Sequence, residues 1–352
     1  MPRIIDDRET LAGFLSRGRS GTVVAVDTEA DSLHRYRESL CLVQFALGED
    51  CVLIDPLAID DLSALAECFS KCETWMHGAD YDMTMLQREF DVLPPKVWDT
   101  QIGARLLGHR KFGLGDLVEH FFGVKLSKSS QKADWGRRPL SDVMIEYALN
   151  DVRYLLPMGE QIVAQLRERG RYEWFVESCQ SARERVLGRN GSRDEAWRIK
   201  GAGKLDPRGL AYLRELWGWR DAEAKAWDRP SFMVANNRDL LQWSMDPAAG
   251  RRVGLPRHYR PNRLRRFDEA AKRAANLPEE QLPTRPQGKR RKRNSAFDRR
   301  LDSLLAQRNT VGASLDIDPS LIAPRAVLEQ LAAEDAAPDE VLLSWQRQCL
   351  GL

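Results

Sequence analysis

Three short apolar runs stand out near the start of the chain. Rich in Val, Leu and Ile, they cover Thr22–Val26, Leu40–Leu47 and Cys51–Ile54. Short apolar runs bounded by turn residues are typical of buried strands. Because Gly48-Glu49-Asp50 leaves room only for a short turn between the second and third runs, we expect these strands to be neighbours in a meander.

The pattern changes after the third run, where helices begin to alternate with strands. Asp60-Asp61 can cap a helix that runs to about Phe69, and Thr74–His77 is expected to form a fourth strand. A second helix is expected over Tyr81–Phe90, because its apolar residues recur at helical spacing. This order of elements predicts an α/β domain with a mixed sheet and helices packed on it.

Two carboxylates come directly after the first predicted strand. Asp27 and Glu29 are two positions apart, so an extended backbone places both side chains on one face. Two like charges at the end of a buried strand are costly unless a cation lies between them. For this pair alone, a solvated strand end is the alternative interpretation.

Two further acidic signals lie downstream. Asp82 immediately precedes the apolar stripe of the second helix, and Asp80 competes with it but is better placed as a helix cap. Tyr147 and Asp151 are one turn apart on a later predicted helix and therefore project together. Each signal taken alone is weak, since a capping carboxylate or a chance spacing would account for it.

The combination is specific. DxE on a first strand, an Asp at a strand-helix junction and YxxxD on a later helix resemble the DEDD exonucleases of the Tyr-bearing subclass, and among them the ribonuclease D family. Further matching segments are Leu42-Val43-Gln44, Leu53-Ile54-Asp55-Pro56-Leu57, Asp99-Thr100-Gln101, Asp134-Trp135, Arg138-Pro139-Leu140 and Tyr154-Leu155-Leu156-Pro157. The resemblance covers roughly residues 1–190 and implies a ribonuclease H-like mixed-sheet exonuclease domain.

The resemblance also implies a mechanism. Hydrolysis of a phosphodiester needs a hydroxide nucleophile and neutralisation of the attacking and leaving oxygens, and two carboxylate-bound divalent cations, Mg²⁺ or Mn²⁺, supply both. By this resemblance Asp27 would bridge the two ions, Glu29 and Asp151 would complete one site, and Asp82 would hold the other ion through water. Tyr147 would orient the attacking water. Cleavage would proceed from the 3′ end.

Three more residues are expected near the substrate path: Gln131, Trp135 and Arg138. Trp135 is equally compatible with a place in the core. Ala30 departs from the family pattern, which has an aromatic residue there, and this difference concerns substrate contacts rather than metal ligands.

The second half of the chain is helical in pattern from about 204 to 283, and it resembles the helicase-and-RNase-D C-terminal (HRDC) domain. We expect Trp217, Trp219 and Trp227 to be core residues there rather than base-stacking platforms. The predicted organisation is an exonuclease domain over 1–190, an HRDC domain over 204–283, a basic linker over 284–296 and a short helical segment over 297–352. The last segment weakly resembles a shortened second HRDC copy.

Charge is distributed unevenly along the chain. Residues 251–300 carry 17 Lys and Arg against 5 Asp and Glu, a local balance of +12 in a protein whose net charge is +2. This block includes Gly288-Lys289-Arg290-Arg291-Lys292-Arg293 and indicates a polyanionic partner.

Other sequence features bear on location and metal type. The chain has no 18-residue apolar run and its opening residues lack a secretory signal, so we expect a cytoplasmic protein without membrane contact. The six cysteines form no CxxC pair and no paired histidines accompany them, which argues against a zinc site.

Taken together, these features predict a metal-dependent 3′–5′ exoribonuclease acting on structured RNA tails, with transfer-RNA precursors as the family's typical substrate. A 3′–5′ DNA exonuclease with the same core is one alternative. A catalytically silent RNA-binding module is another, although the complete set of acids with Tyr147 counts against it. Protein partners are not indicated.

Overall fold

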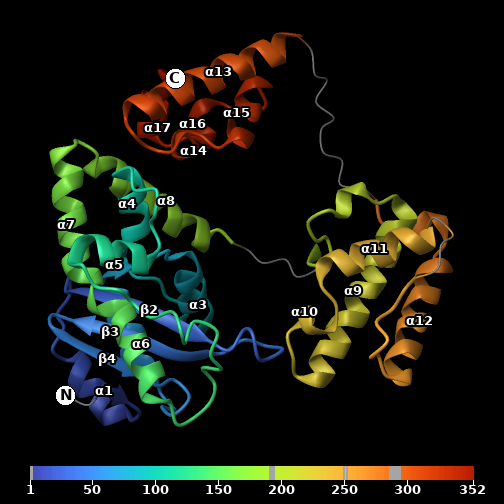
Figure 1. Ribbon diagram of the computed structural model, residues 1–352, viewed down its shortest axis with the longest axis horizontal. Helices are drawn as coiled ribbons and strands as arrows, with labels where there is room; N and C mark the ends of the chain where they lie inside the picture. Colours follow the sequence, from blue (N-terminus) through green and yellow to red (C-terminus); the bar gives the residue numbers. More distant parts are fainter. Residues whose placement is uncertain (1–2, 190–194, 249, 251–252, 285–294) are drawn as a thin grey trace. The chain divides into compact units, whose positions relative to one another are not determined.

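The computed structural model describes residues 3–189, 195–248, 250, 253–284 and 295–352 (Figure 1). Contacts divide the chain into two compact units. The first comprises Met1–Ala30, Leu40–Arg189 and Arg291–Leu352, and the second comprises Asp31–Ser39 and Asn190–Arg290.

The first unit is built on a six-stranded mixed sheet with the order β1-β4-β3-β2-β5-β6. Its strands are β1 (Ile4–Ile5), β2 (Val23–Ala30), β3 (Leu40–Leu47), β4 (Asp50–Ile54), β5 (Glu73–Met76) and β6 (Lys96–Asp99). β2, β3 and β4 are antiparallel neighbours, which confirms the predicted meander, and the other pairs are parallel. The predicted mixed α/β class is therefore correct.

β2 is longer than predicted. It was expected to end at Val26, but its ladder with β3 continues through Asp27 and Glu29, with a register shift between Glu29 and Ala30. Asp27 pairs directly with Gln44 of β3. The two carboxylates therefore lie within a strand and not after its end, which holds their spacing and direction.

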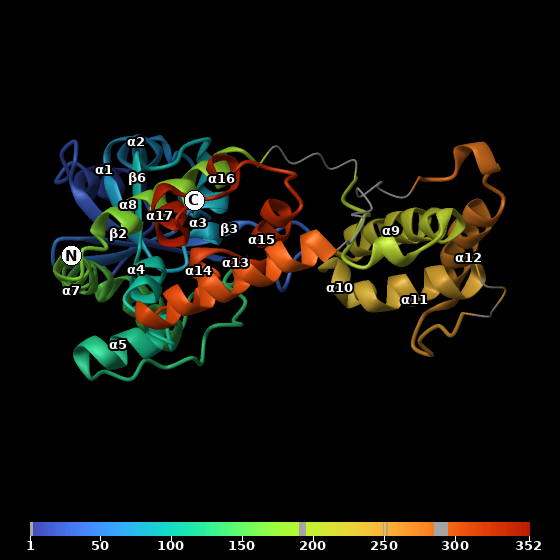
Figure 2. The same cartoon turned by 90° about the horizontal axis from the view of Figure 1, so that it is seen from above.

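Helices cover both faces of this sheet (Figures 1 and 2). They are α1 (Arg8–Leu15), α2 (Ser63–Lys71), α3 (Asp80–Phe90), α4 (Thr100–Leu106), α5 (Leu114–Phe122), α6 (Asp142–Arg153), α7 (Leu155–Glu168) and α8 (Tyr172–Leu187). Val24 and Val26 join the core formed with α1, α2 and α3, whereas Ala25 joins the core formed with α6 and α7. By strand alternation, Asp27 and Glu29 project toward the α6 side.

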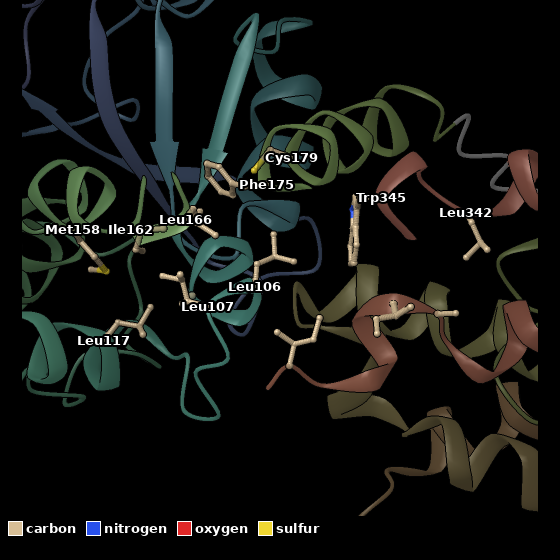
Figure 3. Packing of buried hydrophobic residues seen from close by; sticks show 14 of the residues in the cluster. Leu106, Leu107, Leu117, Met158, Ile162, Leu166, Phe175, Cys179, Leu342 and Trp345 are labelled. Atoms are coloured by element: carbon tan, nitrogen blue, oxygen red, sulfur yellow. The ribbon is translucent and has the colours of Figure 1, made fainter. Parts of the chain in front are cut away.

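The described residues from 295 onward are helical. Their helices are α13 (Ser295–Ser314), α14 (Pro319–Ile322), α15 (Arg325–Ala332), α16 (Pro338–Val341) and α17 (Ser344–Leu350). Trp345 of α17 stacks on Trp174 of α8 with ring centroids 5.0 Å apart, and the Trp345 backbone N–H donates to Glu177. Figure 3 shows Trp345 in the cluster that also contains Phe175. This segment, expected as a separate helical piece, thus shares a core with the nuclease helices.

The regular secondary structure described in the second unit is all helical, in agreement with the expected HRDC-like bundle. Its helices are η2 (Ala202–Lys204), α9 (Pro207–Trp227), α10 (Ser231–Val234), α11 (Asn237–Ala248), α12 (Pro261–Ala275) and η3 (Glu279–Gln281). Trp219 is a core residue in edge contact with Trp243 and Phe267, as predicted. Trp227 is 49% exposed, so its prediction as a core residue is wrong.

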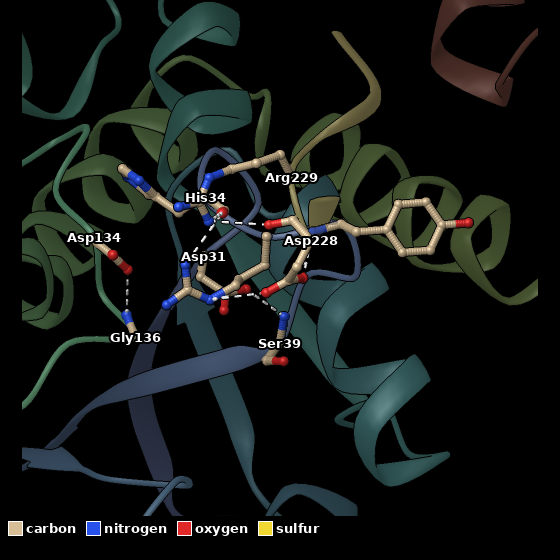
Figure 4. Close-up of polar contacts among 9 residues, drawn as sticks. Asp31, His34, Ser39, Asp134, Gly136, Asp228 and Arg229 are labelled. Atoms are coloured by element: carbon tan, nitrogen blue, oxygen red, sulfur yellow. Dashed lines mark hydrogen bonds and ion pairs between the residues drawn. The ribbon is translucent and has the colours of Figure 1, made fainter. Parts of the chain in front are cut away.

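The loop between β2 and β3 belongs to this second unit. Within Asp31–Ser39, the His34 carbonyl accepts a hydrogen bond from Arg229 at 3.0 Å (Figure 4). The Tyr36 hydroxyl donates to Asp221 at 2.9 Å. The second unit is therefore formed from two separate stretches of the chain.

The basic run Gly288–Arg293 and most of the expected break after Arg189 lie outside the described residues. Within the part of the chain that is described, no helix has both the length and the apolar character needed to cross a membrane.

Candidate active site

Three of the predicted metal ligands meet in one place. Asp27 and Glu29 of β2 and Asp151 of α6 each offer a carboxylate oxygen, and these oxygens lie within 4.8 Å of one another. Strand alternation directs the first two toward α6, which packs against β2, β3 and β4. The expected convergence of acids more than 120 positions apart is thus present in the fold.

Asp82, the fourth acid, is attached to the same strand. Its Oδ1 accepts hydrogen bonds from the Thr28 backbone N–H at 3.1 Å and from the Thr28 hydroxyl at 2.6 Å. Asp82 is buried, whereas Asp80 lies on the surface and forms an ion pair with Arg189 at 2.6 Å. The structure therefore favours Asp82 over Asp80, and the cap expected at Asp80 is replaced by this ion pair.

Burial and mutual repulsion make the four acids hard to ionise together. Burial is the main cause in every case: it raises the pKa of Asp27 well above its usual range, that of Glu29 to about 9, that of Asp151 to about 7 and that of Asp82 to about 6. Repulsion from the neighbouring carboxylates adds to the shift for Asp27, Glu29 and Asp151. Such a group is stable near neutral pH only with protons or cations between its oxygens, and oxygen-only ligands suit hard divalent ions.

Tyr147 lies one helical turn before Asp151 on α6. Burial, followed by the charges of Asp151 and Glu29, raises the pKa of its phenol above the usual range. The hydroxyl therefore stays protonated at neutral pH and is suited to hydrogen bonding rather than to removing a proton. Its ring packs against Trp135, with centroids 6.0 Å apart.

The three predicted substrate residues differ in their surroundings. Trp135 is 1% exposed in a core cluster with Leu42 and Ala148, so the structure favours the core interpretation that the sequence left open. The Arg138 guanidinium donates to both carboxylate oxygens of Asp55 and is engaged there. Gln131 is exposed. Contact of these side chains with substrate stays a prediction.

Sequence reasoning assigned no role to Asp99, which supports the site. Its carboxylate accepts from the backbone N–H groups of Gly78 and Ala79, both at 2.9 Å, directly before α3. It also caps α4 through the Gln101 N–H at 2.8 Å. Asp99 thus fixes the turn from which α3 presents Asp82. Asp99 follows a short apolar run and precedes a helix, and this pattern in the sequence indicates a helix cap.

Comparison with known proteins agrees with this geometry. A family model described as 3′-5′ exonuclease matches residues 2–167. Ribonuclease D of Xanthomonas oryzae pv. oryzae is 32% identical over 357 residues, which cover 99% of this chain and 96% of that protein. The chain belongs to the ribonuclease D family.

Other members of the ribonuclease D family match over nearly the full length. Ribonuclease D of Gluconacetobacter diazotrophicus is 28% identical and covers 99% of this chain and 91% of its own length. The crystal structure of Escherichia coli RNase D superposes with a TM-score of 0.78 at 25% identity, covering 100% of this chain and 97% of that one. As predicted, the protein is a 3′–5′ exoribonuclease.

Proposed function

We propose that Asp27, Glu29, Asp82 and Asp151 hold two divalent cations, Mg²⁺ or Mn²⁺, and that the enzyme removes nucleotides from the 3′ ends of structured RNA. The convergence of three carboxylate oxygens within 4.8 Å supports this proposal most directly. Two such cations supply a hydroxide nucleophile and neutralise charge on the attacking and leaving oxygens.

The side chains have distinct roles in this proposal. Asp27 would be the ligand shared by the two ions, and the other three acids all lie near enough to it to raise its pKa. Asp82 is held by Thr28, the residue between Asp27 and Glu29, so its position is tied to theirs. The protonated Tyr147 hydroxyl orients the attacking water by hydrogen bonding.

For the substrate, we propose the 3′ tails of transfer-RNA precursors, which would be met in the cytoplasm. The Escherichia coli relative is described as an exoribonuclease involved in structured RNA processing. A tail of this kind offers a single-stranded 3′ end beside a folded body, and that end would have to reach the acids carried by β2, α3 and α6.

A degradation assay tests the proposed function. Transfer RNA with a short 3′ tail and a label at its 5′ end should shorten stepwise in the presence of Mg²⁺ or Mn²⁺ and stay intact with a chelator. DNA of the same sequence is the matched substrate and should be degraded more slowly. Faster loss of the DNA would favour the alternative polymer, and RNA that persists with both ions would contradict the metal-dependent mechanism.

A basic surface on the second unit supports RNA as the partner. A hollow of about 830 Å³ is lined by Glu223, Trp227, Arg260, Arg263 and Arg266 among others. Glu223 pairs with Arg263 and Arg266, whereas Arg260 forms no ion pair with any described residue. The Arg263 guanidinium lies 5.4 Å from the centroid of the exposed Trp227 ring. An exposed aromatic ring among cations is suited to a stacked base with its phosphates.

We expect the Trp227→Ala variant to bind single-stranded RNA about tenfold more weakly, because stacking on an aromatic side chain contributes about 1–3 kcal/mol per base. Fluorescence anisotropy of a labelled oligonucleotide in chelator, where no cleavage occurs, measures the change. Met245→Ala removes another exposed apolar side chain of the same unit and is the control. Equal affinities of the two variants would contradict an RNA contact at Trp227.

A further inference from the structure

Gln44 is an unusual buried residue. Its side chain is 0% exposed, and neither its amide nitrogen nor its amide oxygen has a hydrogen-bond partner in the described part of the chain. Buried amides are nearly always hydrogen-bonded, because an unpaired one loses its interactions with water without replacement. An unpaired amide at the centre of a sheet therefore needs an explanation.

The position of Gln44 points to the acidic site. It lies on β3 directly opposite Asp27 of β2, so the two side chains project from the same face of the sheet. Opposite residues in antiparallel strands have Cβ atoms about 4.5–5.5 Å apart, and a Gln side chain can span this gap to a carboxylate. On its other side Gln44 is paired with Leu53 of β4, which offers no polar side-chain atom.

The neighbouring residues on the same face of β3 show that packing in the sheet does not require an amide at position 44. Leu42 and Ala46, the residues two positions away on β3, are apolar and buried under the same layer of helices. An apolar side chain at position 44 would fit this pattern and would leave no polar atom unpaired.

We propose that Gln44 is a positioning residue of the active site, whose amide N–H donates a hydrogen bond to the Asp27 carboxylate, directly or through one water, when the divalent cations are bound. This inference rests on the proposed role of Asp27 as the bridging ligand. A donor to the back of a ligating carboxylate holds its remaining oxygen lone pairs toward the ions, and such outer partners usually change metal affinity by about 10- to 100-fold.

The Gln44→Leu variant separates this role from a purely structural one. In the metal-free protein its unfolding temperature should stay the same or rise, because an unpaired buried amide has been removed. Its affinity for Mn²⁺, measured by calorimetric titration without RNA, should fall about tenfold. A structural role alone does not predict weaker ion binding by a protein that is at least as stable.

Thr74→Val is the matched control. The Thr74 hydroxyl is likewise 0% exposed and unpartnered, but Thr74 of β5 pairs with Val24 of β2, whose side chain lies on the opposite face of the sheet from Asp27. This variant should show the same or higher stability with unchanged Mn²⁺ affinity. If Gln44→Leu does not fold, Gln44→Asn, which keeps the amide but shortens its reach, should show the loss of Mn²⁺ affinity.

Unchanged Mn²⁺ affinity in the folded Gln44 variants, with normal binding by the wild-type protein, would overturn this inference and leave the proposed metal site intact. Failure of the wild-type protein to bind Mn²⁺ would instead overturn both.

Discussion

The Asp27→Asn variant is expected to lose about a thousandfold or more in kcat on tailed RNA while it binds that RNA as tightly as the wild-type protein. Asn keeps the size of the side chain but removes the charge from the ligand proposed to lie between the two ions. A thousandfold loss corresponds to about 4 kcal/mol of lost transition-state stabilisation. Single-turnover degradation measures the rate, and anisotropy in chelator measures binding.

The same substitution should stabilise the metal-free protein, which makes a folding defect easy to recognise. Burial and three neighbouring carboxylates oppose ionisation of Asp27, so on folding at pH 8 its carboxylate must either take up a proton or keep its charge at a cost, and both destabilise the fold. Asn carries no such cost, and the unfolding temperature without metal should rise. A variant that remains active, or one that loses both stability and RNA binding, would contradict the assignment of Asp27.

The affinity of the wild-type protein for Mn²⁺ is expected to fall at least about 100-fold between pH 8 and pH 6. Metal ions bind ionised carboxylates, so a carboxyl that is still protonated must lose its proton before the ion can bind. For each such carboxyl, the Mn²⁺ affinity falls tenfold for every pH unit below the pKa of that carboxyl. Burial raises the pKa of Glu29 to about 9, so this one residue is enough to give the effect. Calorimetric titrations in two buffers with different ionisation enthalpies also count the protons released.

The free energy of unfolding of the metal-free protein should also depend on pH, and it should fall as pH rises. Between about pH 4 and pH 9 the folded protein holds more protons on its four raised carboxyls than the unfolded chain does, so its stability falls as pH rises. Glu29→Gln should flatten both pH dependences. Equal Mn²⁺ affinities at pH 6 and pH 8 would show that the carboxylates are already ionised, and the electrostatic description of the site would then be incorrect.

The parts of the fold that follow from local pattern were predictable. β3 occupies the predicted Leu40–Leu47, because a continuous apolar run bounded by turns leaves little choice of ends. β1 was missed, since its two residues, Ile4–Ile5, are too few to show a period. The extension of β2 past Val26 was not predicted, because its residues Asp27, Thr28 and Glu29 are polar and do not continue the apolar run. In the sheet, Asp27 and Glu29 nevertheless pair with buried positions of β3.

The site itself was predictable as far as its residue types carried chemistry. The acids and Tyr147 could be named because their order and spacing are unusual, and three of the acids do converge. Burial of large side chains could not be predicted in the same way. Trp135 is buried by residues of β3, β4 and α6, whereas Trp227 is exposed at the end of α9. In both cases the exposure of the side chain depends on elements that are distant in the sequence.

The Asp31–Ser39 loop is hydrogen-bonded by Arg229 and Asp221 of the second unit. These bonds affect the design of a fragment that contains the exonuclease domain alone. Cutting the gene at residue 190 would strip that loop of both partners, although the loop itself is encoded well upstream of the cut. A truncated enzyme would then carry a loosened segment two residues beyond Glu29. Replacing the loop by a tight hairpin turn offers a way to make such a fragment without that defect.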